Sequence, residues 1–458
     1  MIKKNFSKNI FSKIKRINWI VLLGWILALG LCITLNLGKV LIVLFPAGAL
    51  ALGLFYYLTS PEYYLGFTWS IIFAAPLIKR IIDYVNGYVT PGPWDLTARI
   101  VAFVSVLTLI RYLPRFNKED TLFIICAASI FYGFILAIIN AQRDLDTLIY
   151  IFIGWIDPVL IGFHLSKNWP RYLSFSQTTR RCFLWGTLLL GLYGIIQFVF
   201  APSWDAFYII NSEAKTLGSP EPFGIRVFST MGSPHEYAMT TMAGLLLLLV
   251  HRSKYRFIAL GTGLLGLLLT VARGPWLGFA FGSILLISLL KEHLQIRFIL
   301  NIVLVILLAT PIIIAEPFNT VIFSRFSSVS NIENDVSLQV RAGQYSQIID
   351  LALSEFVGRG LETPDNILNN DSGVTKTLLS LGWIGTIPYL SGFFVLLSKV
   401  FEKHDNNTDI YLNAFNSIIF GIVIQFALIP VFDGSIGILI WGFIGMRIAS
   451  NHYYFSRL

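Results

Sequence analysis

The chain is dominated by long apolar runs that are separated by short polar segments. Runs of about 18 residues or more recur along its length, and a helix of that length crosses about 30 Å of hydrocarbon. The runs do not alternate apolar and polar residues, as the strands of a membrane barrel would. Because a backbone in lipid must satisfy its own hydrogen bonds, this pattern predicts membrane-spanning helices.

The pattern predicts about fourteen spans. Their expected limits are residues 19–36, 39–58, 64–82, 97–113, 121–139, 147–165, 182–200, 236–250, 256–271, 275–291, 297–315, 375–398, 409–431 and 434–450. Lys79 and Arg80 are expected to shorten the third. A basic N-terminus leads into the first run, and no cleavage-site pattern follows, so this run is predicted to be a retained span. We therefore expect an all-α integral membrane protein, with residues 1–458 forming a single polytopic membrane domain.

Composition agrees with a protein surrounded by lipid. Of its residues, 55% are hydrophobic and 13% are charged, against about 25% charged in soluble domains. The net charge of +9 comes from short basic clusters between apolar runs, which is typical of cytoplasmic loops, so nucleic acid is not an expected partner. Cys32, Cys126 and Cys182 lie in or beside apolar runs and have no metal-ligand spacing.

The distribution of Lys and Arg sets the orientation, because these residues are retained on the cytoplasmic side. With the N-terminus inside, every second loop is basic, and both chain ends are predicted to be cytoplasmic. The same count places two larger segments outside, at 201–235 and 316–374. Loops of that length are usually functional or disordered. Apolar residues spaced between Val336 and Phe356 predict an amphipathic helix within the second loop.

The expected outer face carries four features that suit anion or sugar chemistry. An arginine near the start of a helix suits an anion, because the helix N-terminus is electropositive. The features are Arg226 with the turn-forming residues up to His235, Arg273 in a tight turn followed by Trp276, Arg341 near the predicted amphipathic helix, and Gly358-Arg359-Gly360 followed by Asp371.

Each feature also has a purely structural interpretation. A single external arginine commonly contacts lipid headgroups, and Trp276 fits an interfacial anchor. His235 fits a helix start, and Asp371 fits the N-cap of the span at 375–398. The combination is more specific, because Arg226, Arg273 and Arg341 come from separate loops on one face. Guanidinium groups make bidentate contacts to phosphate oxygens, so together they would suit a diphosphate.

At these positions the sequence resembles the O-antigen ligase and O-antigen polymerase superfamily. The resemblance covers about residues 180–400 and is carried by three groups of residues in the same order and spacing. These are Arg226-Val227-Phe228 with Ser233-Pro234 and Ala238, then Ala272-Arg273-Gly274 with Trp276-Leu277-Gly278, and then Arg341, Gly358-Arg359-Gly360 and Leu381-Gly382-Trp383-Ile384-Gly385.

The resemblance implies a GT-C-like bundle with a large, partly helical periplasmic loop in the bacterial inner membrane. It implies transfer of a glycan from undecaprenyl diphosphate to an acceptor hydroxyl on the outer face, with no metal or nucleotide cofactor. Its partners would be the lipid-linked glycan, an acceptor glycan or lipid-linked repeat, membrane lipids, and a chain-length regulator or export machinery. Arg226, Arg273 and Arg341 would hold the diphosphate, with His235, Arg359 and Trp276 as further substrate contacts.

One departure bears on the type of transferase. Ligases of the superfamily have a histidine before the helix that follows the large loop, whereas this chain has Asn370-Asp371-Ser372-Gly373 there. The departure favours a polymerase-like member, with Asp371 as the candidate base and Arg273 as its catalytic companion.

Two other classes of function remain as alternatives. A lipid-linked oligosaccharide flippase commonly has fourteen helices as well, but transporters tend to carry ionisable residues within their spans, and these spans carry few. A non-enzymatic scaffold for envelope assembly would tolerate loss of any one of Arg226, Arg273 and Arg341.

Overall fold

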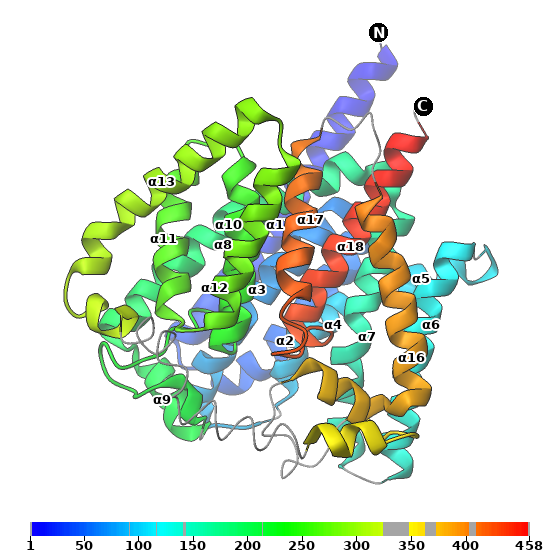
Figure 1. The fold of residues 1–458 in the computed structure, drawn as a ribbon, viewed down its shortest axis with the longest axis horizontal. Coiled ribbons are helices and arrows are strands. Elements are labelled where there is room, and N and C mark those ends of the chain that lie inside the picture. Colours follow the sequence, from blue (N-terminus) through cyan, green and yellow to red (C-terminus); the bar gives the residue numbers. More distant parts are fainter. Residues whose placement is uncertain are drawn as a thin grey trace.

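The computed structural model describes residues 2–456, apart from residues 91, 116, 141–142, 213, 324–347, 362–371 and 403–408. This part of the chain is a bundle of helices (Figure 1). The helices are α1 (Ile2–Thr34), α2 (Gly38–Thr59), α3 (Pro61–Asn86), α4 (Thr97–Phe103), α5 (Val106–Tyr112), α6 (Lys118–Ile139), α7 (Leu145–Lys167), α8 (Tyr172–Phe200), α9 (Ser203–Asn211), α10 (Pro234–Val250), α11 (Arg256–Leu269), α12 (Arg273–Leu289), α13 (Glu292–Ile314), α16 (Gly373–Phe401), α17 (Ile410–Val423) and α18 (Gly434–Phe455). In the described residues no strand forms, and Gly218 and Ile225 make an isolated antiparallel bridge.

Each predicted apolar span contains helical structure, although residues 424–431 of the span predicted at 409–431 follow α17 and are not helical. Within the described ranges, nine helical segments are long and apolar enough to cross a membrane, and α11, α12 and α17 are shorter apolar helices. The all-α membrane architecture is therefore confirmed. The total of about fourteen crossings remains a prediction.

The third predicted span is longer than the sequence indicated. We expected Lys79 and Arg80 to shorten the run at 64–82, but α3 continues to Asn86. Both cations have acidic partners, since Lys79 pairs with Asp83 at 2.6 Å and Arg80 with Asp205 at 3.0 Å. A charge that is paired in this way can be accommodated beside lipid, so the helix does not end there.

The centre of the bundle is formed by α7, α10 and α18, whose side chains are mostly buried. Helices α7 and α18 pack closely because glycines face each other. A Cβ atom added at Gly445 would lie 2.4 Å from the carbonyl oxygen of Gly162. Small residues at such crossings let two backbones approach, which is how helices associate without a hydrophobic driving force.

The terminal ends of α1 and α18 lie on one side of the bundle, and the connection between α8 and α10 lies on the other (Figure 1). The second side carries α9 and residues 348–361, and we call it the loop face. The described residues 348–354 form a helix whose Ile348 and Leu351 pack against Leu378 and Leu379 of α16. The remainder of the predicted amphipathic helix lies outside the described residues.

The span predicted at 97–113 is broken into α4 and α5 by a turn at Val104 and Ser105. The turn frees backbone carbonyls inside the bundle, and a buried tyrosine satisfies them. The hydroxyl of Tyr64 donates to the carbonyl oxygens of Val101 at 2.9 Å and Ala102 at 3.0 Å. Such a break is tolerated at membrane depth only where protein groups replace the lost hydrogen bonds.

Helix α16 is interrupted at Gly382, which has φ 58° and ψ −176°. Residues 355–361 run beside this break and pair with it. The amide of Arg359 donates to the carbonyl of Leu379 at 2.8 Å, and that of Trp383 donates to Glu355 at 3.3 Å. The Gly-Arg-Gly motif and the Leu381–Gly385 motif of the sequence are therefore in contact with each other.

Gly382→Ala should destabilise the protein. A Cβ atom there would lie 2.3 Å from the amide nitrogen of Gly358, and the positive φ is unfavourable for any residue with a side chain. We expect a loss of about 2–3 kcal/mol, seen as a lower thermal unfolding midpoint in detergent. Gly261→Ala is the matched control, because a Cβ atom there meets nothing within 4 Å. Equal midpoints for the two variants would contradict this account of the break.

Candidate functional site

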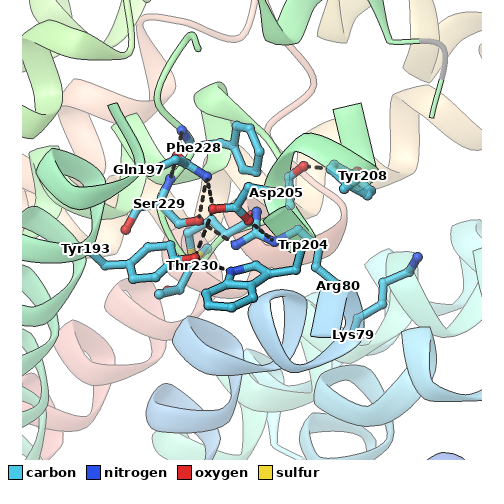
Figure 2. Close-up of polar contacts among 12 residues, drawn as sticks. Lys79, Arg80, Tyr193, Gln197, Trp204, Asp205, Tyr208, Phe228, Ser229 and Thr230 are labelled. Carbon is cyan, nitrogen blue, oxygen red and sulfur yellow. Dashed lines mark hydrogen bonds and ion pairs between the residues drawn. The ribbon is translucent and has the colours of Figure 1, made fainter. Parts of the chain in front are cut away.

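A buried ion pair joins the 201–235 segment to helix α3 of the bundle. Nε of Arg80 in α3 lies 3.0 Å from a carboxylate oxygen of Asp205 in α9, and the two side chains are 1% and 0% exposed. The other guanidinium nitrogens of Arg80 donate to the carbonyls of Met231 at 3.0 Å and Ser229 at 2.5 Å. Arg80 thus binds both ends of the segment at once (Figure 2).

Helix α8 contributes the remaining partners of this network. Tyr193 and Gln197 each donate to Asp205 at 2.9 Å, and the amide oxygen of Gln197 accepts from the backbone of Ser229 at 2.7 Å. Burial raises the pKa of the Asp205 carboxyl, while Arg80, Gln197 and Tyr193 oppose that rise. The network therefore holds three separate pieces of chain in one position.

The structure brings the regions of Arg226 and Arg273 together. Nε of Arg226 donates to the carbonyl of Thr270 at 2.6 Å, and the amide of Val227 donates to Leu269 at 3.2 Å. Thr270 follows α11 directly, and Arg273 begins α12 three residues later. Two arginine-bearing segments that are distant in sequence thus lie side by side on the loop face.

Trp276 and His235 lie close to the start of helices, as the sequence indicated. The indole nitrogen of Trp276 donates to the carbonyl of Leu267 at 2.8 Å, which ties α12 to the end of α11. His235 lies in the first turn of α10, where the side chain of Ser233 accepts from the amide of Glu236 at 3.3 Å.

The remaining predicted site residues are at the large loop. Nε of Arg359 pairs with Glu355 at 2.9 Å, and its backbone belongs to the segment that satisfies the break in α16. Arg341 and Asp371 lie outside the described residues. Of the three arginines that were predicted to converge, the structure therefore describes Arg226 and Arg273, whose segments are in contact.

A second group of charged residues, which the sequence patterns did not reveal, lies toward the loop face and extends into the interior of the bundle at Asp157, in the middle of α7. We call it the loop-face cluster. Its members are Lys79, Asp83, Asp95, Arg99, Asp157, Glu236, Lys376 and Asp433.

Close ion pairs form on two sides of this cluster. Lys79 lies 2.6 Å from Asp83 and 3.4 Å from Asp95, and Lys376 lies 2.7 Å from Asp433. Arg99 lies between them and interacts electrostatically with Asp95, Asp157 and Glu236. Among the described residues no group of three His, Cys, Asp or Glu residues is arranged to hold a metal ion.

A signal for this cluster was present in the sequence. Asp157 interrupts the apolar run at 147–165, and Arg99 and Lys376 lie inside two other predicted spans. An ionisable residue inside a span is expensive and usually functional or paired. These few residues come from separate spans, and nothing in a linear sequence shows that they meet.

No protein-family model matches this chain, and no curated protein has a matching sequence. The geometry of the loop face is therefore the main evidence about function.

Loss of the Arg80–Asp205 ion pair should weaken the attachment of residues 201–235 to the bundle. Arg80→Ala leaves the Asp205 carboxyl buried without its countercharge, and removing one partner of a buried pair costs about 3–5 kcal/mol. The expected result is a lower thermal unfolding midpoint, with faster protease cleavage within residues 201–235.

The exposed Arg111 of α5 provides the control variant, Arg111→Ala. Combining Arg80→Met with Asp205→Asn should recover part of the stability, because no unpaired charge is then buried. Wild-type stability of Arg80→Ala would show that the pair does not anchor the segment.

Proposed function

We propose that this chain is a membrane glycosyltransferase that moves a glycan from undecaprenyl diphosphate to a sugar hydroxyl on the loop face. The observation that carries the proposal is the contact between the Arg226 segment and the turn that leads to Arg273. Two guanidinium groups from adjacent segments offer a site for a diphosphate, and the N-terminus of α12 adds to its positive potential. The loop face would be the outer face of the bacterial plasma membrane, with the chain ends cytoplasmic.

The proposed reaction is one displacement at a sugar carbon. The acceptor hydroxyl oxygen attacks the anomeric carbon of the donor, the bond from that carbon to the diphosphate oxygen breaks, and its electron pair leaves with the diphosphate. A carboxylate takes the proton of the attacking hydroxyl. Arg226 and Arg273 would stabilise the charge that builds on the leaving diphosphate, which is stronger in the transition state than in the ground state.

The proton acceptor has more than one candidate in this proposal. Asp371 keeps that role from the sequence, where it stands in place of the histidine of ligases. The loop-face cluster supplies further carboxylates at the same face, among which Glu236 directly follows His235. The absence of a histidine before α16 favours chain polymerisation over ligation.

A flippase is the second candidate, and two observations favour it. The span at 97–113 is broken near its middle, and a fully buried carboxylate, Asp157, lies in the neighbouring helix α7. Transporters commonly bind their substrates beside discontinuous helices and intramembrane charges.

Loss of the Arg273 guanidinium should separate the two candidates. Arg273→Ala is expected to reduce polymer formation by about a hundredfold or more, because transition-state charge stabilisation of this kind is worth about 3–4 kcal/mol. Single lipid-linked repeats should accumulate with their sugars accessible to an impermeant label outside the cell. The measurement is analysis of lipid-linked glycans from cells that express each variant.

Arg252→Ala is the matched control, since Arg252 is exposed in the predicted cytoplasmic loop after α10. Repeats that accumulate but stay inside would identify a flippase. Long chains that accumulate on the lipid would identify a ligase. Unchanged polymer would exclude a role for Arg273 in the reaction.

A further inference from the structure

The guanidinium of Arg99 is held in place mainly by backbone and ring contacts. Its NH1 nitrogen donates to the carbonyl of Tyr150 at 3.1 Å, and its central carbon lies 4.1 Å from the centroid of the Tyr150 ring. A Cβ atom at Gly154 would lie 2.3 Å from NH1, and one at Gly434 would lie 3.8 Å from NH2. The group is therefore wedged between α7 and the start of α18, and most of its donors remain unused by the described residues.

Two carboxylates, Asp157 and Glu236, interact electrostatically with Arg99 but do not form an ion pair with it. Asp157 interacts electrostatically with Arg99 and Asp433, and Glu236 interacts with the same two residues. In the part of the chain that the structure describes, no carboxylate comes within ion-pair distance of Arg99. Opposite charges that interact without pairing can be bridged by a polar group that contacts both of them.

Asp157 gives the clearest indication of contact with a further polar group. Its side chain is 0% exposed, and neither carboxylate oxygen has a hydrogen-bond partner among the described residues. It follows Gly154 by three positions in α7, so it lies on the helix face that Arg99 contacts. A buried carboxylate without donors is costly, and such a group in a native structure calls for a ligand or an ordered partner.

The charges near Arg99 and Asp157 distinguish among the possible classes of ligand. A phosphate would suit Arg99 but would be repelled by Asp157, Glu236 and Asp433. A metal cation would suit those carboxylates but would be repelled by Arg99 and by Lys376 beside Asp433. A sugar hydroxyl satisfies both sides, because it donates to a carboxylate and accepts from a guanidinium at the same time.

We propose that Arg99, Asp157, Glu236 and Asp433 form a subsite that binds hydroxyl groups of the transferred glycan. The proposal rests on the glycosyltransferase function and deepens it. It assigns sugar recognition to residues of α4, α7 and α10 and to Asp433 just before α18, and leaves the diphosphate to the segments of Arg226 and Arg273. Two aromatic rings hold the cations beside the subsite, since Arg99 lies 4.1 Å from the Tyr150 ring centroid and Lys376 lies 5.6 Å from that of Trp155.

The test compares binding of two lipids to the full-length protein in nanodiscs. One is undecaprenyl diphosphate without sugar, and the other is the undecaprenyl-diphosphate-linked glycan extracted from the same cells. Asp157→Asn should weaken binding of the glycan-bearing lipid by about tenfold or more. The reason is that the substitution replaces a charged acceptor of the sugar hydroxyl with a neutral amide, whose NH₂ group cannot accept a hydrogen bond. Binding of the sugar-free lipid should not change.

Asp144→Asn is the matched control, because Asp144 is exposed just before α7 at the same face. Glu236→Gln provides a second variant and should show the same selective loss if Asp157→Asn fails to fold. An equal effect on both lipids, or no effect on either, would overturn the sugar subsite while leaving the proposed function standing. A wild-type protein that binds neither lipid would overturn the proposed function and the subsite with it.

Discussion

One buried ion pair, between Arg80 and Asp205, holds the chain between α8 and α10 against the bundle at the loop face. The pair joins α3 to α9, and the same guanidinium also holds the backbone at Ser229 and Met231. Through these contacts the chain between α8 and α10 cannot move independently of the bundle. The Arg226 segment and the start of α10, which carry much of the candidate site, are therefore fixed by a charge buried in the protein.

The need to satisfy backbone groups away from water explains the two breaks in the helices. Tyr64 replaces the hydrogen bonds that are lost between α4 and α5. Residues 355–361 do the same for α16 at Gly382, and this contact also ties the large loop to the bundle. Each break lies beside a part of the loop face that carries charge, Arg99 in one case and Arg359 in the other. Irregular backbone in a membrane protein is expected where it borders a functional cavity or is covered by protein.

Charges on the loop face fall into two environments with different chemical properties. Arg226 contacts the residue that follows α11, and Arg273 begins α12, so two guanidinium groups and one helix N-terminus lie near each other, which suits an anion. In the loop-face cluster carboxylates and cations alternate, so neither a phosphate nor a metal ion is favoured throughout. A lipid-linked glycan has both kinds of group, a diphosphate and a set of hydroxyls. The two environments together would suit the two halves of the proposed substrate.

The sequence by itself determined the helical class and the approximate position of every apolar span, because the cost of exposing backbone to lipid acts on each run separately. It also gave Arg226 and Arg273 as candidate site residues, because their turn-forming neighbours are local signals, and their role stays a prediction. It misjudged α3, because the partner of Arg80 lies more than a hundred residues away in α9. Only the tertiary structure brought Arg99, Asp157, Glu236 and Asp433 together. These residues come from four helices, and each taken alone resembles an ordinary charge near the end or middle of a span. Electrostatic interaction depends on distance in space, which a linear pattern does not contain.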